Sequence, residues 1–153
     1  MSITYYSHTD GIKLLAKMLY DEKLTPIIGA GFTRNCSSKK ATVPDGNQAT
    51  EIMKKMINEI RQINLSSADF NKISERFFSI VPKEKRWGFF ETYFTQVTLP
   101  EYLSAFLALP WAYIYTLNVD DGIERTGLYT PVLPYQDANV PNRSMKLPLC
   151  TLK

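Results

Sequence analysis

The sequence predicts an α/β fold: a Rossmann-like parallel sheet with a helical insertion between the first strand and a later strand ending in Asn-x-Asp. Two short apolar runs, 24–28 and 111–116, are typical of buried strands. The first leads into Gly29-Ala30-Gly31-Phe32-Thr33 and the second into Asn118-Val119-Asp120. Since parallel strands present their carboxyl ends at one edge, the two endings are expected side by side, where α/β sheets bind nucleotides.

The elements around the first strand follow from local patterns. Apolar residues at helical spacing after Thr9 and Asp10 predict a capped amphipathic helix over 9–22. The strand 24–28 comes next, and its glycine turn is expected to open a second helix. The small polar residues 34–40 then predict a loop.

The insertion is predicted to be helical throughout. Apolar residues recur at helical spacing over 47–63. A start signal at 66–69 predicts a helix containing Phe70, Ile73, Phe77 and Ile80. Two prolines begin the next helices: one after Pro82, with Trp87, Phe90, Tyr93 and Phe94 on one side, and one over 101–109.

The remainder of the chain is richer in proline. The strand at 111–116 follows Pro110, and a short helix is expected to begin at Asp120 and to end at Gly127. Brief strands are predicted at 130–133 and 147–152. The last is expected to be an unpaired terminal strand, which favours self-association.

Composition fits one globular domain over residues 1–153. The net charge is +3 without a clustered basic patch, which argues against nucleic-acid binding. Cys36 and Cys150 form no CxxC pair, which favours a reduced, cytoplasmic setting and suggests no metal site. No signal peptide is visible, and the longest apolar stretch, 102–115, is broken by Pro110. We therefore expect a soluble protein without a membrane partner.

The two strand endings suit a dinucleotide. Backbone N–H groups of Ala30, Gly31 and Phe32 could bind a pyrophosphate, and the Thr33 hydroxyl could add a hydrogen bond. A tight turn without a ligand is the alternative, because the three glycines of G-x-G-x-x-G are absent. The Asn-x-Asp ending has an alternative of its own as a helix cap.

These residues resemble a known family. Gly29-Ala30-Gly31-Phe32-Thr33 is similar to the Gly-Ala-Gly-x-Ser signature of sirtuins and sirtuin-like NAD-consuming domains. Thr116-Leu117-Asn118-Val119-Asp120 resembles their Thr-Gln-Asn-Ile-Asp, or the Thr-x-Asn-Tyr-Asp of the bacterial NAD-hydrolase branch. Gly31 and Asn118 are 87 positions apart, similar to the family's separation. Val43-Pro44-Asp45 resembles part of the Ile-Pro-Asp-Phe-Arg loop of sirtuins.

The resemblance implies roles for single residues. Asn118 would be the catalytic residue beside the nicotinamide ribose, and Asp120 would help to order the site. Gly29, Ala30, Gly31, Phe32, Thr33, Asp45, Asn118 and Asp120 would together bind NAD, with a helix cap as the alternative for Asp45. The family's general base is a His in a His-Gly pair after a later strand. The chain stops where that pair is expected, which predicts either a C-terminally truncated domain or a natural short form that lacks its base.

The resemblance therefore implies a hydrolase that releases nicotinamide from NAD⁺, in bacterial anti-phage defence. NAD would be its substrate, with NAD⁺ or ADP-ribose as ligand. A non-catalytic nucleotide-binding or protein-interaction module is one alternative, and an NAD-dependent protein deacylase is another. A homo-oligomer or a C-terminal partner domain also stays open.

Overall fold

The computed structural model describes residues 4–63, 65, 69–132 and 147–151. It is a mixed α/β structure, and contacts divide the chain into two compact units. The sheet unit comprises residues 1–29, 100–118 and 126–153, and the helical unit comprises 30–99 and 119–125. The chain passes from one unit to the other directly after Gly29 and directly after Asn118. No helix in the described part of the chain is long and apolar enough to cross a membrane.

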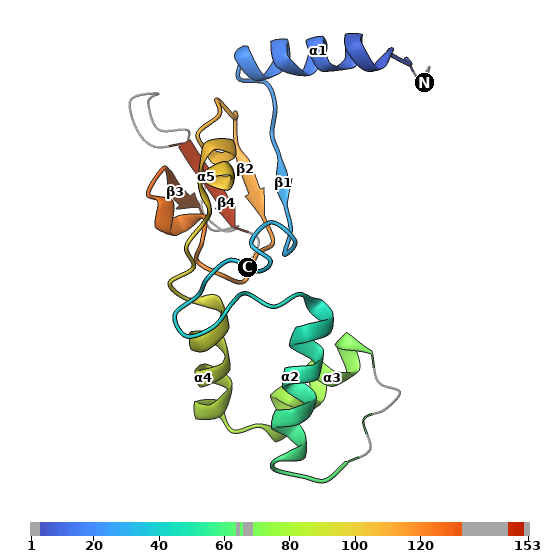
Figure 1. Cartoon of the computed structure of the whole chain (residues 1–153), viewed down its shortest axis with the longest axis vertical. Coiled ribbons are helices and arrows are strands. Elements are labelled where there is room, and N and C mark those ends of the chain that lie inside the picture. Colours follow the sequence, from blue (N-terminus) through green and yellow to red (C-terminus); the bar gives the residue numbers. More distant parts are fainter. Residues whose placement is uncertain (1–3, 64, 66–68, 133–146, 152–153) are drawn as a thin grey trace. The chain divides into compact units, whose positions relative to one another are not determined.

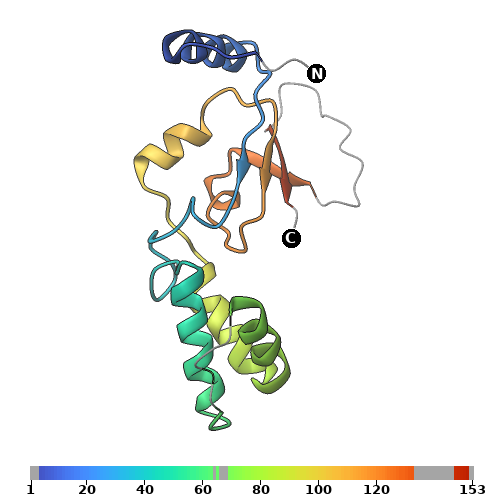
Figure 2. The same cartoon turned by 90° about the vertical axis from the view of Figure 1, so that its right-hand side faces the viewer.

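In the described residues, the sheet unit has four parallel strands in the order β1-β2-β4-β3 (Figures 1 and 2). Their bounds are β1 Ile27–Ile28, β2 Ile114–Thr116, β3 Tyr129–Val132 and β4 Leu147–Thr151. The predicted strands are thus confirmed, although β1 and β2 are shorter than expected. The prediction that the last strand is unpaired is wrong, because β4 lies between β2 and β3 and pairs with both.

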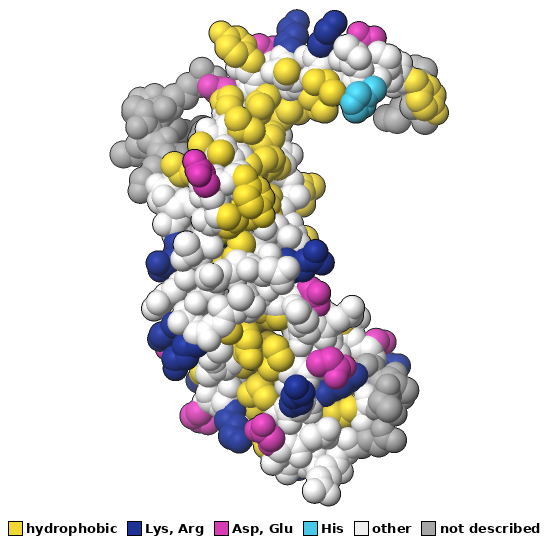
Figure 3. All heavy atoms as spheres, in the orientation of Figure 1, with side chains coloured by type: hydrophobic (Ala, Val, Ile, Leu, Met, Phe, Trp, Pro, Cys, Tyr) yellow, Lys and Arg dark blue, Asp and Glu magenta, His cyan; other side chains and the backbone are white. Residues whose placement is uncertain are grey.

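The part of the sheet unit that the structure describes also includes the helices α1 (His8–Tyr20) and α5 (Glu101–Leu107). The Ser7 hydroxyl caps α1 by accepting a hydrogen bond from the Asp10 N–H group. This helix buries none of its residues, and Figure 3 shows hydrophobic side chains gathered along it and along the segment that leads into β1. The core of the unit lies instead around the fully buried Leu107 and Ile114.

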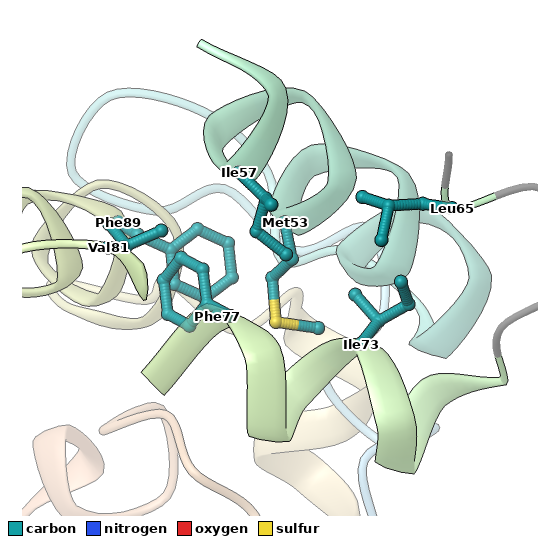
Figure 4. Packing of buried hydrophobic residues seen from close by; sticks show 7 residues of the cluster. All are labelled: Met53, Ile57, Leu65, Ile73, Phe77, Val81 and Phe89. Atoms are coloured by element: carbon teal, nitrogen blue, oxygen red, sulfur yellow. The ribbon is translucent and has the colours of Figure 1, made fainter. Parts of the chain in front are cut away.

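The helical unit contains α2 (Gly46–Asn58), α3 (Phe70–Ile80) and α4 (Lys83–Phe94). Asp45 and Asp69 cap the first two, as the start signals predict. The buried residues that pack between these helices are Met53, Ile57, Leu65, Ile73, Phe77, Val81 and Phe89 (Figure 4). The three predicted helices are confirmed and lie between β1 and β2 in the chain, as expected. The first of them is shorter than predicted, because α2 ends at Asn58 and residues 59–60 form a turn, so the helix does not extend to Ile63.

Three local predictions are wrong. Residues 29–45, all of them described, form turns and isolated bridges, so no helix opens at the glycine turn. Trp87 was expected on the packed side of α4, yet 63% of it is exposed and Phe89 is buried in its place. The expected helix at Asp120 is reduced to a 3₁₀ turn, η1 (Glu124–Thr126).

Candidate functional site

The carboxyl ends of β1 and β2 are neighbours in the sheet unit. Ile28 is paired with Thr116 in parallel register, and the Leu117 N–H group donates a 3.0 Å hydrogen bond to the Ile28 carbonyl. Gly29 and Asn118 therefore leave the sheet at the same edge. This confirms the expectation that the two strand endings emerge side by side.

Beyond the strands, a side-chain hydrogen bond joins the same two motifs within the helical unit. The Thr33 hydroxyl donates to Asp120 Oδ2 at 2.7 Å, between residues 87 positions apart in sequence. Thr33 is completely buried and Asp120 is 3% exposed, so the bond is shielded from water. Because hydrogen bonds to ionised groups are the stronger ones, this contact holds the glycine segment to the Asn-x-Asp segment.

The Asp120 carboxylate sits in an environment that disfavours its charge. Burial raises its pKa above the ordinary range, and the nearby Glu124 carboxylate acts in the same direction. The hydrogen bonds from Thr33 and from the Gly122 N–H group oppose this rise but do not cancel it. The charge of Asp120 also adds to burial in raising the pKa of the Cys36 thiol. A perturbed carboxyl group held by directed donors is typical of functional sites and also occurs in structural networks.

Gly122 is a positioning residue that the sequence reasoning missed. Its N–H group donates to Asp120 Oδ1 at 2.9 Å. A Cβ atom added at Gly122 would lie 2.9 Å from that oxygen and 3.0 Å from Val97 Cγ1. Only glycine fits there without displacing the carboxylate. The available signal was the Asp-x-Gly order, which is typical of an Asx turn.

Asp121 anchors the same segment on its other side. Its carboxylate accepts hydrogen bonds from the backbone N–H groups of Gln96 and Val97, at 2.8 Å and 2.9 Å. The Asp121 N–H group in turn donates to the Phe94 carbonyl. The two adjacent acids thus have separate tasks: Asp120 holds the glycine segment and Asp121 holds the end of α4.

Asn118 is buried, at 1% exposure, one residue before the chain enters the helical unit. Its backbone N–H group donates a 3.1 Å hydrogen bond to the hydroxyl of Thr116, which is itself fully buried at the end of β2. This bond turns the backbone as it leaves the strand. Burial of an amide side chain is costly unless it is hydrogen-bonded, so this side chain is expected to have a structural or a functional task.

The glycine turn is not explained by the needs of the fold. Gly29 and Gly31 both have ordinary negative φ angles. Apart from the adjacent residues of the chain, no described atom lies within 4 Å of a Cβ added at either position. Larger residues would therefore fit both the backbone and the packing. A turn that is kept free of side chains is consistent with close approach of a ligand.

Asp45 has a role that its local structure accounts for. Its carboxylate accepts from the Gln48 N–H group at 2.8 Å, and the Gln48 side chain accepts from the Asp45 N–H group at 2.9 Å. This reciprocal pair is a capping box at the start of α2. The helix-cap interpretation of Asp45 therefore has direct support, while its assignment to NAD stays a prediction.

The described residues contain no group of three or more His, Cys, Asp or Glu side chains that could hold a metal ion. The single histidine of the sequence, His8, begins α1, and α1 leads into the amino end of β1. Asn118, by contrast, follows the carboxyl end of β2. Comparisons of the chain with family models, with curated proteins and with solved structures found no match.

Proposed function

We propose that this chain binds NAD⁺ and belongs to a hydrolase that releases nicotinamide, with a role in bacterial anti-phage defence. The observation that supports it most is the buried hydrogen bond between Thr33 and Asp120. It joins the two segments whose order and spacing resemble sirtuin-like NAD-consuming domains. The same proposal includes a Rossmann-like arrangement of the sheet and membership of the sirtuin-like NAD-consuming family.

Each motif then has a chemical task. The backbone of Ala30, Gly31 and Phe32 would donate to the pyrophosphate, whose approach the glycines leave open. Because no helix begins at this turn, the N–H groups of the turn itself supply these donors, without a helix dipole. Asp120 would act by positioning the turn through Thr33.

The proposed reaction breaks the bond between nicotinamide and C1′ of its ribose. Water supplies the oxygen that joins C1′, so the products are nicotinamide, ADP-ribose and one proton. The Asn118 amide would orient this water or the ribose hydroxyls, since a fixed near-attack geometry lowers the barrier of such a reaction. Asn118 is the residue we assign to catalysis.

Nicotinamide release from NAD⁺, measured by chromatography, tests the proposal. A general base contributes about 10²–10⁴-fold, and the one histidine precedes β1, so we expect slow release that added imidazole accelerates. Asn118→Ala should abolish release in both conditions, whereas Asn71→Ala, at an exposed position in α3, should leave it unchanged. Release that is unaffected by Asn118→Ala would remove Asn118 from the mechanism.

A nucleotide-binding module without catalysis is the second candidate. The position of His8 favours it, because α1 is attached to the opposite end of the strands from Asn118. Binding of ADP-ribose without any nicotinamide release, with or without imidazole, would select this candidate. Including an acetyl-lysine peptide in the same assay separates the deacylase alternative, which requires the peptide for release.

A further inference from the structure

A second candidate site lies within the helical unit, at the end of α3 and along α4. Phe78, Lys83, Arg86, Trp87 and Phe90 line a cavity of about 270 Å³. Phe78 and Trp87 are 52% and 63% exposed, which is unusual for such large aromatic side chains. None of these residues belongs to the segments that we assign to NAD⁺.

The aromatic surface is held in place by its neighbours. The Arg86 guanidinium donates a 2.7 Å hydrogen bond to the Phe78 carbonyl and lies 5.3 Å from the centre of the Phe78 ring. The Phe78 and Phe90 rings are stacked at 6.3 Å, and Phe78 also contacts the fully buried Phe77. A partner would therefore meet a preorganised surface and lose little affinity to ordering it.

Size and charge restrict what can bind there. The cavity is smaller than the roughly 300–1,000 Å³ of small-molecule sites, and it suits a single inserted side chain. Its lining carries two cations, Lys83 and Arg86, and no acidic residue. An exposed Trp beside an Arg is also the composition typical of interaction hot spots.

We propose that this surface binds an acidic segment of a partner protein. One aromatic side chain of the segment would enter between Phe78 and Trp87, and a neighbouring carboxylate would pair with Lys83. Single-stranded nucleic acid fits less well, since it requires cations along a groove and several stacking rings in succession. The chain's net charge of only +3 agrees with this preference.

Fluorescence titration of the whole chain tests the proposal, because Trp87 is exposed and Trp111, the other tryptophan, is 9% exposed. The probe is a pentapeptide with a central phenylalanine flanked by glutamates. We expect saturable binding that weakens at least tenfold in Trp87→Ala. Because this variant loses the fluorophore, its affinity is measured by isothermal calorimetry. Lys83→Gln should weaken binding several-fold and reduce its salt dependence.

Tyr102→Ala is the matched control, since Tyr102 is an aromatic residue 71% exposed on α5 and should leave binding unchanged. Three results would overturn the proposal. They are equal affinity in Trp87→Ala, equal affinity for the peptide with glutamines in place of glutamates, and binding of oligo(dT) without binding of the peptide. Circular dichroism of each variant establishes that the fold is retained.

Discussion

Replacing Thr33 by valine removes one hydroxyl group and keeps the shape of the side chain. The lost interaction is the 2.7 Å hydrogen bond to Asp120 Oδ2, between a fully buried residue and one that is 3% exposed. Water cannot easily replace the donor at such a position. The Asp120 carboxylate would keep the Gly122 N–H group, but its other oxygen would lose this hydrogen bond.

Hydrogen bonds to charged groups contribute about 1.5–3 kcal/mol, so we expect Thr33→Val to lower the free energy of unfolding by about 2 kcal/mol. Thr50→Val is the matched control. Thr50 is 8% exposed, and its hydroxyl donates at 2.7 Å to the neutral Gly46 carbonyl within α2. Its loss should cost about 1 kcal/mol or less.

Urea denaturation of Thr33→Val, Asp120→Ala and the double variant forms a cycle that isolates the pair. We expect a coupling energy of about 2 kcal/mol, within the range for contacting residues. Additive effects, or a Thr33→Val cost no larger than that of Thr50→Val, would refute the reasoning that this bond joins the two motifs.

Three further predictions concern Asp120, Gly122 and Tyr129. Carbon NMR should show that the Asp120 carboxyl group titrates above its ordinary pKa, and Thr33→Val should raise this pKa further. Because ionisation of Asp120 costs more in the folded state, the contribution of this group to stability falls as pH rises above 3.8. Gly122→Ala should destabilise the chain by about 1–3 kcal/mol in thermal or urea unfolding, because its Cβ would meet the carboxylate and Val97. Burial raises the pKa of Tyr129 from 10.0 to about 12, so stability should fall by roughly 2 kcal/mol between these pH values and much less in Tyr129→Phe.

The sequence was sufficient to predict the features that depend on chain direction and local pattern. The two apolar runs form neighbouring parallel strands. The segments that follow them are joined by the hydrogen bond between Thr33 and Asp120. The capping signals at Asp45 and Asp69 begin the expected helices. In each case the residues that decide the structure are close in sequence or follow from the geometry of a parallel sheet.

Features that depend on distant partners could not be predicted in this way. β4 is paired on both sides because β3 lies next to it, opposite β2. No local sequence pattern indicates the position of β3 in the sheet. In α4, aromatic residues occupy several sides of the helix, so periodicity cannot choose between Trp87 and Phe89. Phe89 is the one that is buried because its ring packs against Phe77, at 5.3 Å between ring centres. The need for glycine at position 122 could not be predicted for the same reason. The side chains of Val97 and Leu99, which are distant in sequence, leave no room for a Cβ atom there.

The central claim, that the glycine turn binds NAD⁺, is tested most directly by calorimetric titration with ADP-ribose. Gly31→Val should keep the fold, because apart from the adjacent residues no described atom lies within 4 Å of the added Cβ, yet it should obstruct the pyrophosphate. Gly88→Val, at an equally open position in α4, is the control. We predict that the unmodified chain and Gly88→Val bind ADP-ribose with the same affinity and that Gly31→Val binds at least tenfold more weakly. Equal affinity in a folded Gly31→Val, or no binding by the unmodified chain, would contradict the claim.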